Sequence, residues 1–282
     1  MTVPFWVIQS DLNAKAHLAE MAHTLRQIAV PFVGCQLTPF SNEIEYLFEP
    51  PPADAFVIPY GTTKLTALAR KEGWAGLFYD EDTFCVDAWI RNRTDMLNQE
   101  VEIMSVATVE KRFAGYHDED EHFFIRPVAD LKAFTGCVVS ARELASFSTS
   151  HHAGSAFGSG IHYAKEFTLD TACAVSPAQE IIGEWRFFIV GGEPVSGSAY
   201  RHHGRHIEHR VDMAHESIAR TVRRLCDGWL PHQVCVMDIA HVKEDGVSKI
   251  KVIEFNAFNA SGFYDHDVAA VARAVSAWAA KQ

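Results

Sequence analysis

The sequence predicts a mixed α/β (α+β) protein in which strands and helices occur along most of the chain. Three observations support this prediction. Strand-like and helix-like patterns alternate through the first hundred residues, and strand-like runs dominate beyond residue 170. Apolar residues make up 48% and charged residues 22% of the 282 residues, which is typical of folded globular proteins and excludes a disordered or collagen-like chain.

The first hundred residues predict a small βαβ layer. The apolar runs PFWVIQS, PFVGCQL and AFVIPYG predict strands. The periodic segments Ala14 to Ala29 and TTKLTALARKEG predict helices after the first and third of these strands. A further helix is expected around Thr94 to Met104. A domain boundary near residue 100 would divide the chain into 1–100 and 101–282.

The next part of the chain carries signals of loops and short helices. An acidic run at Asp118 to Glu121 predicts an exposed loop before the strand HFFIRPV. Ser140 followed by Glu143 predicts a capping box that begins a helix. The glycine-rich segment Ser148 to Gly160 predicts a long loop. Two interpretations of residues 154–160 stay equally open, a mobile lid over a ligand and an ordinary flexible loop.

Strands dominate the last part of the chain. The β-rich runs are ACAVSPAQEI, EWRFFIV, EPVSGSAYR, QVCVMDIAHV and SKIKVIEFN. One helix, from about Asp212 to Gly228, interrupts them. The chain ends in a helix with Asp267 as its N-cap and an apolar stripe formed by Val268, Val271, Val275 and Trp278.

The charge balance and the cysteines restrict the partners and the compartment. With 25 Lys and Arg against 36 Asp and Glu, the net charge of −11 repels nucleic acids and anionic membranes, so we expect neither as a partner. The six cysteines form no CxxC pair and no zinc-finger spacing, which predicts reduced thiols. The sequence shows no signal-peptide pattern and no apolar run of membrane-spanning length, so we expect a cytoplasmic protein.

The most informative region consists of two β-rich runs joined at Asp245-Gly246, which is a hairpin signal. A three-residue turn centred on Gly246 would place Asp238 directly opposite Glu254, and Asn256 would share their face. Three oxygen-bearing side chains would then converge, which suits Mg²⁺. One alternative is a polar patch that faces solvent. Another is a two-residue turn without a bulge, which would put the two carboxylates on opposite faces.

A second hairpin is expected where EWRFFIVGG meets EPVSGSAYR, with Gly191-Gly192 supplying the positive φ values of the turn. Its pairing predicts three charged and two small residues on one face: Glu184, Arg186, Arg201, Gly197 and Ala199. Guanidinium groups in such a place bind phosphate or carboxylate, and a nearby Glu orients them. The alternative is an exposed charged face with an ordinary Glu–Arg pair.

Arg126 ends the strand HFFIRPV immediately before Pro127, and Lys132 follows in the loop. A cation at a strand end beside a turn is well placed to meet phosphate groups. In the alternative interpretation, Lys132 extends along the surface and Arg126 pairs with the acidic run.

Histidines and arginines are concentrated in the segment YRHHGRHIEHR, Tyr200 to Arg210. The spacing of His202, His203, His206 and His209 permits metal binding. We favour a cationic loop that faces the substrate, because the segment contains no cysteine and no defined helix.

These motifs together resemble the ATP-grasp superfamily over roughly residues 100 to 270. The strand MDIA, the ending IEFNAFNASGFYDHD and the hairpin from EWRFFIV to SAYR are similar to the family's metal-binding and phosphate-binding strands in their usual order. The resemblance implies an ATP-grasp fold of two α+β subdomains that hold Mg-ATP, preceded by a small βαβ pre-ATP-grasp domain. Where the family has lysine before proline, this chain has Arg126-Pro127, and with IRPxxDxKxFxG this departure is similar to the R-to-K clade.

The resemblance also implies roles for single residues. Asp238, Glu254 and Asn256 match the family's Mg²⁺ ligands, the last two through its E-x-N motif. Arg186 and Arg201 match residues that contact the γ-phosphate or the acyl group, and Lys132 matches the clade's catalytic lysine. The segment PAQEII holds the place of the family's adenine-binding hinge. The implied nucleotide ligands are Arg126, Lys132, Gln179, Glu180, Ile182, Glu184 and Arg186.

The activity implied by the resemblance is ATP-dependent ligation of a carboxylate to an amine through an acylphosphate. Members of the R-to-K clade are regarded as amino-acid or peptide ligases, so small-molecule or peptide carboxylates and amines are the implied substrates. Phosphotransfer to another acceptor is one alternative, because the same Mg²⁺ and arginine apparatus serves a kinase. A non-catalytic nucleotide-binding module is the other, and the departure at Arg126 keeps it open.

Overall fold

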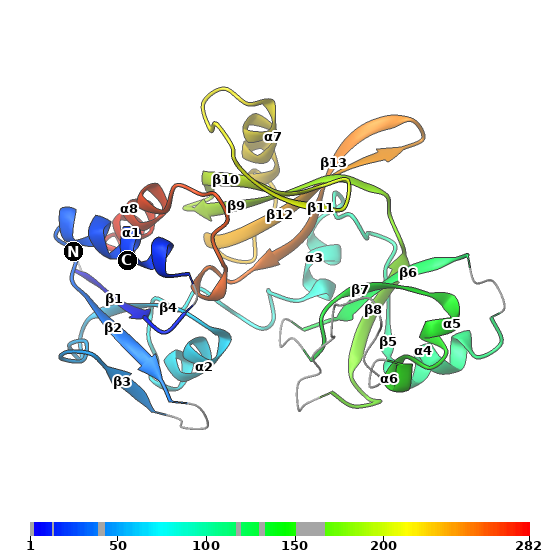
Figure 1. The fold of residues 1–282 in the computed structure, drawn as a ribbon, viewed down its shortest axis with the longest axis horizontal. Helices are drawn as coiled ribbons and strands as arrows, with labels where there is room; N and C mark the ends of the chain where they lie inside the picture. Colours follow the sequence, from blue (N-terminus) through cyan, green and yellow to red (C-terminus); the bar gives the residue numbers. More distant parts are fainter. Residues whose placement is uncertain (1–2, 13, 39–42, 117–119, 130–132, 151–166) are drawn as a thin grey trace. The chain divides into compact units, whose positions relative to one another are not determined.

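The computed structural model describes residues 3–12, 14–38, 43–116, 120–129, 133–150 and 167–282 (Figure 1). Its contacts divide the chain into two compact units. The first unit contains residues 1–80, 182–241 and 254–282, and the second contains 81–181 and 242–253. A compact unit need not coincide with a domain defined by its function, so the boundary near residue 100 stays a prediction.

The N-terminal part of the first unit is a small sheet with its helices. Its elements are β1 (Pro4–Gln9), α1 (Lys15–Gln27), β2 (Phe32–Leu37), β3 (Ile44–Tyr46), β4 (Phe56–Tyr60) and α2 (Thr63–Lys71). The strand order is β3-β2-β1-β4. β1 is parallel to both β2 and β4, and β3 is antiparallel to β2. The predicted βαβ layer is therefore present.

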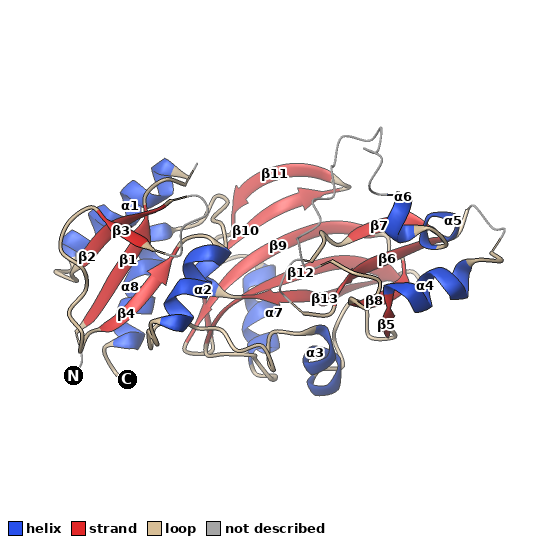
Figure 2. Cartoon of the chain, turned by 90° about the horizontal axis from the view of Figure 1, so that it is seen from below, coloured by secondary structure: helices blue, strands red, loops and turns tan. Residues whose placement is uncertain are grey.

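Neighbouring residues of β1 pack on opposite faces of this sheet, because side chains alternate along a strand. Trp6 and Ile8 join a core with α1 and the C-terminal helix α8 (Val268–Ala279), whereas Val7 joins a second core with α2. Figure 2 shows α1 and α8 together on one side of the sheet. Asp267 caps α8 as predicted, since its Oδ1 accepts a hydrogen bond from the Ala270 amide at 2.8 Å.

A five-stranded sheet follows later in the chain. Its elements and their neighbours are β9 (Ile181–Val190), β10 (Glu193–His202), β11 (Arg205–Arg210), α7 (Ser217–Cys226), β12 (Val234–Glu244), β13 (Val247–Asn256) and η1 (Phe258–Ala260). The strand order is β11-β10-β9-β12-β13. Phe188 of β9 and Val236 of β12 join the core formed by α1, α8 and β1.

Two expectations for this region are wrong. The segment after Arg201 is a hairpin with its own strand, β11, rather than a loop, and His203 and Gly204 form its turn with φ values of 45° and 73°. The helix expected from Asp212 begins later, at Ser217. Asp212 instead accepts hydrogen bonds from backbone amides that follow it, which stabilises a turn before the helix.

The second unit contains an antiparallel sheet of order β5-β8-β6-β7. Its elements are α3 (Val86–Asn92), β5 (Glu102–Ser105), α4 (Val106–Phe113), β6 (His122–Pro127), β7 (Cys137–Ser140), α5 (Ala141–Leu144), α6 (Phe147–Ser150) and β8 (Ala172–Pro177). Ile125 and Val175 face a core with α4, α5 and α6. Ser140 and Glu143 form the predicted capping box of α5.

The helix expected around Thr94 to Met104 is wrong. Met96 forms a parallel bridge with Val252, and the Leu97 amide donates to the Val252 carbonyl at 2.7 Å. The end of the segment belongs to β5, and the helix of this region, α3, lies earlier in the chain. Pairing with a strand distant in sequence outweighs the weak local helix propensity.

No helix within the described ranges is long and apolar enough to cross a membrane. All six cysteines are present as thiols. Burial raises the pKa of Cys35, Cys137 and Cys173 to about 12, so these groups stay protonated at neutral pH.

Candidate functional site

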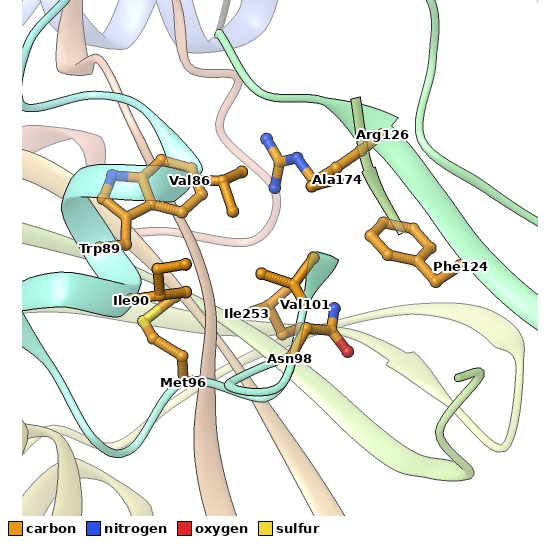
Figure 3. Close-up of a pocket in the computed structure, with 10 residues that line it drawn as sticks. All are labelled: Val86, Trp89, Ile90, Met96, Asn98, Val101, Phe124, Arg126, Ala174 and Ile253. Atoms are coloured by element: carbon orange, nitrogen blue, oxygen red, sulfur yellow. The ribbon is translucent and has the colours of Figure 1, made fainter. Parts of the chain in front are cut away.

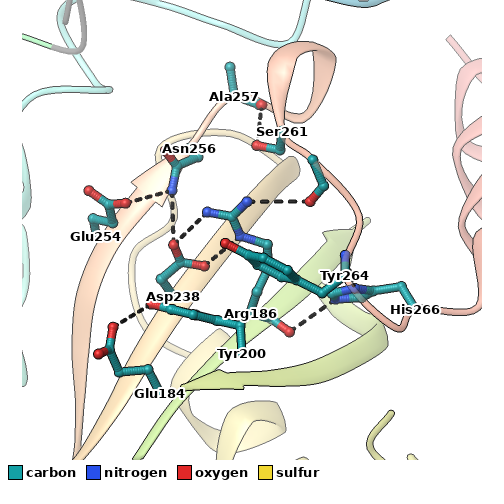
Figure 4. Close-up of polar contacts among 11 residues, drawn as sticks. Glu184, Arg186, Tyr200, Asp238, Glu254, Asn256, Ala257, Ser261, Tyr264 and His266 are labelled. Atoms are coloured by element: carbon teal, nitrogen blue, oxygen red, sulfur yellow. Dashed lines mark hydrogen bonds and ion pairs between the residues drawn. The ribbon is translucent and has the colours of Figure 1, made fainter. Parts of the chain in front are cut away.

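A polar cluster joins the middle of β12 to the end of β13 in the first unit (Figure 4). Asp238 lies on β12, and Glu254 and Asn256 lie two residues apart on β13. The Asn256 amide nitrogen donates to Oδ2 of Asp238 at 3.3 Å and to Oε1 of Glu254 at 3.1 Å. The three side chains predicted as metal ligands therefore converge.

The turn between these strands differs from the expectation. Asp245 and Gly246 form a two-residue turn with φ values of 52° and 80°, instead of a three-residue turn. A two-residue turn followed by regular pairing would separate Asp238 from Glu254. Since Asn256 contacts both, the pairing shifts by one residue between the turn and the cluster.

Arg186 of β9 forms a two-pronged ion pair with Asp238. Its Nε donates to Oδ1 at 2.8 Å and its Nη2 to Oδ2 at 2.7 Å, while Nη1 donates to the Gly262 carbonyl at 3.3 Å. Only 13% of the Arg186 side chain and 3% of the Asp238 side chain are exposed. The guanidinium thus compensates the buried carboxylate.

The electrostatics of the cluster favour a cation. Burial raises the pKa of Asp238 to about 6, with a further contribution from Glu254, although Arg186 opposes this effect. Burial and the nearby carboxylates also raise the pKa of the Tyr200 hydroxyl, which stays protonated. An added cation would stabilise the ionised form of both Asp238 and Glu254.

The donor set of the cluster fits Mg²⁺. Two carboxylates and an amide oxygen are the hard oxygen ligands that this ion prefers. The NH₂ group of Asn256 lies between the two carboxylates, where it supplies the positive end of a dipole. A half-turn of this amide would present its oxygen to an ion instead.

The hairpin of β9 and β10 is partly as predicted. Gly191 and Gly192 form its turn with φ values of 63° and 80°. The register shifts after Pro194 and again before Arg201, so Gly197 is paired with Phe187 rather than with Arg186. A Cβ on Gly197 would lie 2.3 Å from the Phe187 ring. Gly197 and Ala199 therefore do not surround the arginines, and that expectation is wrong.

Glu184 and Arg201 are directly paired across this hairpin, on one face as predicted. Arg201 Nη1 donates to Oε1 of Glu184 at 3.2 Å. The hydroxyl of Tyr200, the extra residue of the second register shift, donates to Oε2 at 2.8 Å. The Arg201 side chain is 53% exposed, so this pair is far more accessible than the pair of Arg186 and Asp238.

Two further residues of the site, Tyr264 and His266, lie in the loop that follows the E-x-N motif. The Tyr264 ring lies 5.2 Å from the Arg186 guanidinium carbon and stacks on Tyr200 with centroids 5.0 Å apart. His266 Nδ1 accepts from the Tyr264 amide at 3.3 Å, so Nε2 carries the proton and donates to the Arg186 carbonyl at 3.2 Å. Burial lowers the pKa of His266 to about 3.

Tyr200, Tyr264 and His266 are not predicted from the sequence as residues of the site. Tyr264 and His266 lie in the segment IEFNAFNASGFYDHD, and their place in this segment is the only sequence feature that points to a role in the site. Tyr200 carried no signal, because it faces Glu184 through an irregular register.

The loop after β13, the strand that carries the E-x-N motif, is fixed to the N-terminal sheet. Asn259 Oδ1 accepts from the Phe78 amide at 2.8 Å, and its Nδ2 donates to the carbonyls of Pro59 at 2.7 Å and Gly76 at 2.9 Å. The Asn259 carbonyl accepts from the Gly61 amide at 2.9 Å. This fully buried side chain holds one end of the loop that carries Tyr264.

A separate pocket in the second unit contains Arg126 (Figure 3). Arg126 and Phe124 point away from the core formed with α4, α5 and α6, because they alternate with Ile125. The Arg126 guanidinium lies 5.0 Å from the Trp89 ring of α3. Apolar walls with one cationic group are typical of small-molecule pockets.

The remaining predicted residues have separate places. Gln179 and Glu180 lie in the connection between β8 and β9, and Ile182 lies in β9. Lys132, the loop at 154–160, and Asp118 and Glu119 of the acidic run lie outside the described residues. In the ranges that the structure describes, no three His, Cys, Asp or Glu side chains group as a metal site, and this includes the four histidines of the β10–β11 hairpin.

The fold and the cluster define a class of protein. A helix-covered, mostly parallel sheet, an antiparallel sheet with an arginine at a strand end, and a third sheet with an E-x-N strand are the elements implied by the ATP-grasp resemblance. The chain belongs to this superfamily: residues 66–275 match the model of an ATP-grasp domain family, the third family of the R-to-K clade. The predicted superfamily and clade are both confirmed.

Solved structures share the fold at low sequence identity. D-cycloserine synthetase DcsG aligns with a TM-score of 0.58 and 10% identity over 98% of this chain and 99% of its own. A RimK domain ATP-grasp protein from Sphaerobacter thermophilus aligns with a TM-score of 0.56 and 14% identity, over 96% of this chain and 99% of its own. ATP-grasp ligase PsnB was solved in complex with a phosphomimetic variant of its minimal precursor, Mg and ADP. It aligns with a TM-score of 0.52 and 11% identity, over 99% of this chain and 99% of its own. No curated protein matches the chain.

Proposed function

We propose that the protein is an ATP-dependent ligase that joins a carboxylate to an amine. The observation that carries the proposal is the convergence of Asp238, Glu254 and Asn256 with the Arg186 guanidinium on one sheet face. Membership of the ATP-grasp superfamily supports it. So do the structural relatives, which include a synthetase and a ligase complexed with Mg and ADP.

The first unit would hold the reacting phosphate. Asp238, Glu254 and Asn256 are the proposed Mg²⁺ ligands, and the ion would neutralise charge on the ATP phosphates. Arg186, and Arg201 at the accessible edge, would supply positive charge to the γ-phosphate or the acyl group. Glu184 orients Arg201 through their ion pair.

The proposed reaction has two steps. A substrate carboxylate oxygen attacks the γ-phosphorus, the bond from this phosphorus to the bridging oxygen breaks, and ADP leaves. The amine nitrogen then attacks the acyl carbon, the phosphate leaves, and the nitrogen loses a proton. Positioning and charge stabilisation are sufficient for this chemistry, so no nucleophilic side chain is required.

The rest of the nucleotide site is proposed from the second unit and the connection to β9. Arg126 and Lys132 would contact phosphates, and Gln179, Glu180 and Ile182 would contact the base. Arg126 already borders an apolar pocket, which supports this assignment. A pre-ATP-grasp domain at 1–100, an ATP-grasp domain at 101–282 and a cytoplasmic location complete the proposal.

Product analysis tests the ligase function. The protein would be incubated with Mg-ATP and pooled amino acids and short peptides, and all products identified by mass spectrometry. We expect ADP together with an amide-linked product, and a loss of turnover of about 100-fold or more in Asp238→Asn.

Asp245→Asn is the matched control, because Asp245 is exposed at the turn of the same hairpin. An unchanged rate in Asp238→Asn would contradict the assigned metal site. ADP with a phosphorylated acceptor and no amide would identify a phosphotransferase instead.

A further inference from the structure

The hairpin of β10 and β11 carries two matched pairs of one arginine and one histidine. Arg201 is paired with His206, and His202 is paired with Arg205. Because side chains alternate along a strand, the two pairs project from opposite faces of the sheet. Arg201 is also paired with Glu184, so Arg201 and His206 lie on the face that carries Arg186.

The pair on the site face is rich in hydrogen-bond donors. An arginine has five N–H donors and no acceptor, and Arg201 gives one of them to Glu184 at 3.2 Å. Its side chain is 53% exposed, and that of His206 is 65% exposed. Directly opposed side chains in an antiparallel pair have Cβ atoms about 5 Å apart, so both residues can contact one small group.

Tyr264 connects this pair to the reactive end of the site. Its ring centroid lies 6.1 Å from that of His206 and 5.2 Å from the Arg186 guanidinium carbon. The Tyr264 ring therefore lies between His206 of this pair and Arg186, the arginine that contacts the proposed metal ligand Asp238. This separation suits a group that is part of the substrate but does not react.

We propose that Arg201 and His206 bind a second, non-reacting carboxylate of the substrate. The substrate class would then be a compound with an acidic side chain, either a free acidic amino acid or an acidic residue within a peptide. A planar guanidinium matches a carboxylate with two parallel hydrogen bonds, and the imidazole adds a third donor. The inference rests on the proposed ligase function and makes Arg201 a contact of the carboxylate substrate rather than of the γ-phosphate.

Binding measurements with acid and amide probes test this inference. Glutamate and glutamine, and aspartate and asparagine, would be titrated calorimetrically into the protein with Mg²⁺ and a non-hydrolysable ATP analogue. We expect one of the acids to bind about tenfold more tightly than its amide. The peptides Ala-Glu-Ala and Ala-Gln-Ala form a second arm, which identifies whether the carboxylate comes from a free amino acid or a peptide.

The hairpin supplies its own controls. Arg201→Gln and His206→Gln should each reduce the preference for the acid, whereas His202→Gln and Arg205→Gln, on the reverse face, should keep it. Retained binding of the ATP analogue shows that each variant is folded. Equal binding of acid and amide in both arms, or an unchanged preference in Arg201→Gln and His206→Gln, would overturn the inference.

Failure of this inference is distinguishable from failure of the ligase function. ADP and an amide product formed from a substrate with a single carboxylate would establish the ligase and overturn the second-carboxylate site. Acid-selective binding that depends on Arg201 and His206, without any amide product, would support the site and count against the ligase.

Discussion

Two arginine–carboxylate pairs begin two residues apart on β9, yet they differ in burial and geometry. The inner pair, Arg186 with Asp238, has two direct hydrogen bonds and side chains that are 13% and 3% exposed. The outer pair, Arg201 with Glu184, has one hydrogen bond, and its arginine is 53% exposed. The two pairs therefore differ in accessibility: Arg186 compensates the buried Asp238 carboxylate, whereas Arg201 has N–H donors that are accessible to solvent.

The largest effect on stability is expected when the inner pair is broken. Arg186→Met would leave the Asp238 carboxylate buried without its cation. We expect the free energy of unfolding, measured with urea at pH 7, to fall by about 3–5 kcal/mol. The double variant Arg186→Met with Asp238→Asn should recover part of this loss, because it removes the buried charge. A loss no larger than that of Arg201→Met would contradict the contrast between the pairs.

The free energy of unfolding is expected to depend on pH through His266, whose imidazole donates a hydrogen bond to the backbone carbonyl of Arg186 in the inner pair. Its pKa in the folded state is lowered from 6.5 to about 3, so below pH 6.5 the unfolded chain binds a proton that the folded chain does not. The contribution of His266 to stability should therefore fall as the pH is lowered from 6.5 towards 3, whereas the raised pKa of Asp238 acts in the opposite direction below pH 6.

The size of this effect follows from about 1.4 kcal/mol per pH unit, which gives a loss of about 2 kcal/mol at pH 5. Urea unfolding at pH 5 and pH 7 would measure it. His266→Asn should lose less stability than the unaltered protein between pH 7 and pH 5, whatever its absolute stability. Parallel losses in both proteins would contradict a buried, neutral imidazole.

The smallest effect is expected for the outer pair. Arg201→Gln should change the free energy of unfolding by less than about 1 kcal/mol, because exposed ion pairs are screened by solvent and salt. Urea unfolding at low and high NaCl concentration would check this. A salt-independent loss as large as that of Arg186→Met would show that exposure does not distinguish the two pairs.

Most of the fold follows from sequence patterns. The runs PFWVIQS, EWRFFIV and SKIKVIEFN form strands as predicted, and Asp267 begins the last helix, because local apolar periodicity and capping residues specify these elements. The prediction of a helix at Thr94 to Met104 fails, since the conformation of this segment depends on pairing with Val252. That contact has no local signature.

The convergence of three oxygen-bearing side chains was predictable from the sequence, whereas the residues that surround them were not. Asp238, Glu254 and Asn256 were expected to converge, and they do, although through a different turn and a shift in pairing. The environment of Arg186 was not predictable, because register shifts in β10 move Gly197 away and bring Tyr200 to Glu184. Shifts of this kind depend on tertiary packing rather than on local sequence.

The four hydrogen bonds of Asn259 limit how this protein can be recombined with its relatives. Every partner of Asn259 in the N-terminal region is a backbone atom, at Pro59, Gly61, Gly76 and Phe78. These hydrogen bonds therefore do not restrict which side chains stand at the four positions. They do require the backbone to follow the same path. A chimera that exchanges residues 1–80 would need to reproduce that path to keep the loop beside the E-x-N strand in place. The N-terminal layer therefore helps to position the loop beside the E-x-N strand and is not an interchangeable module.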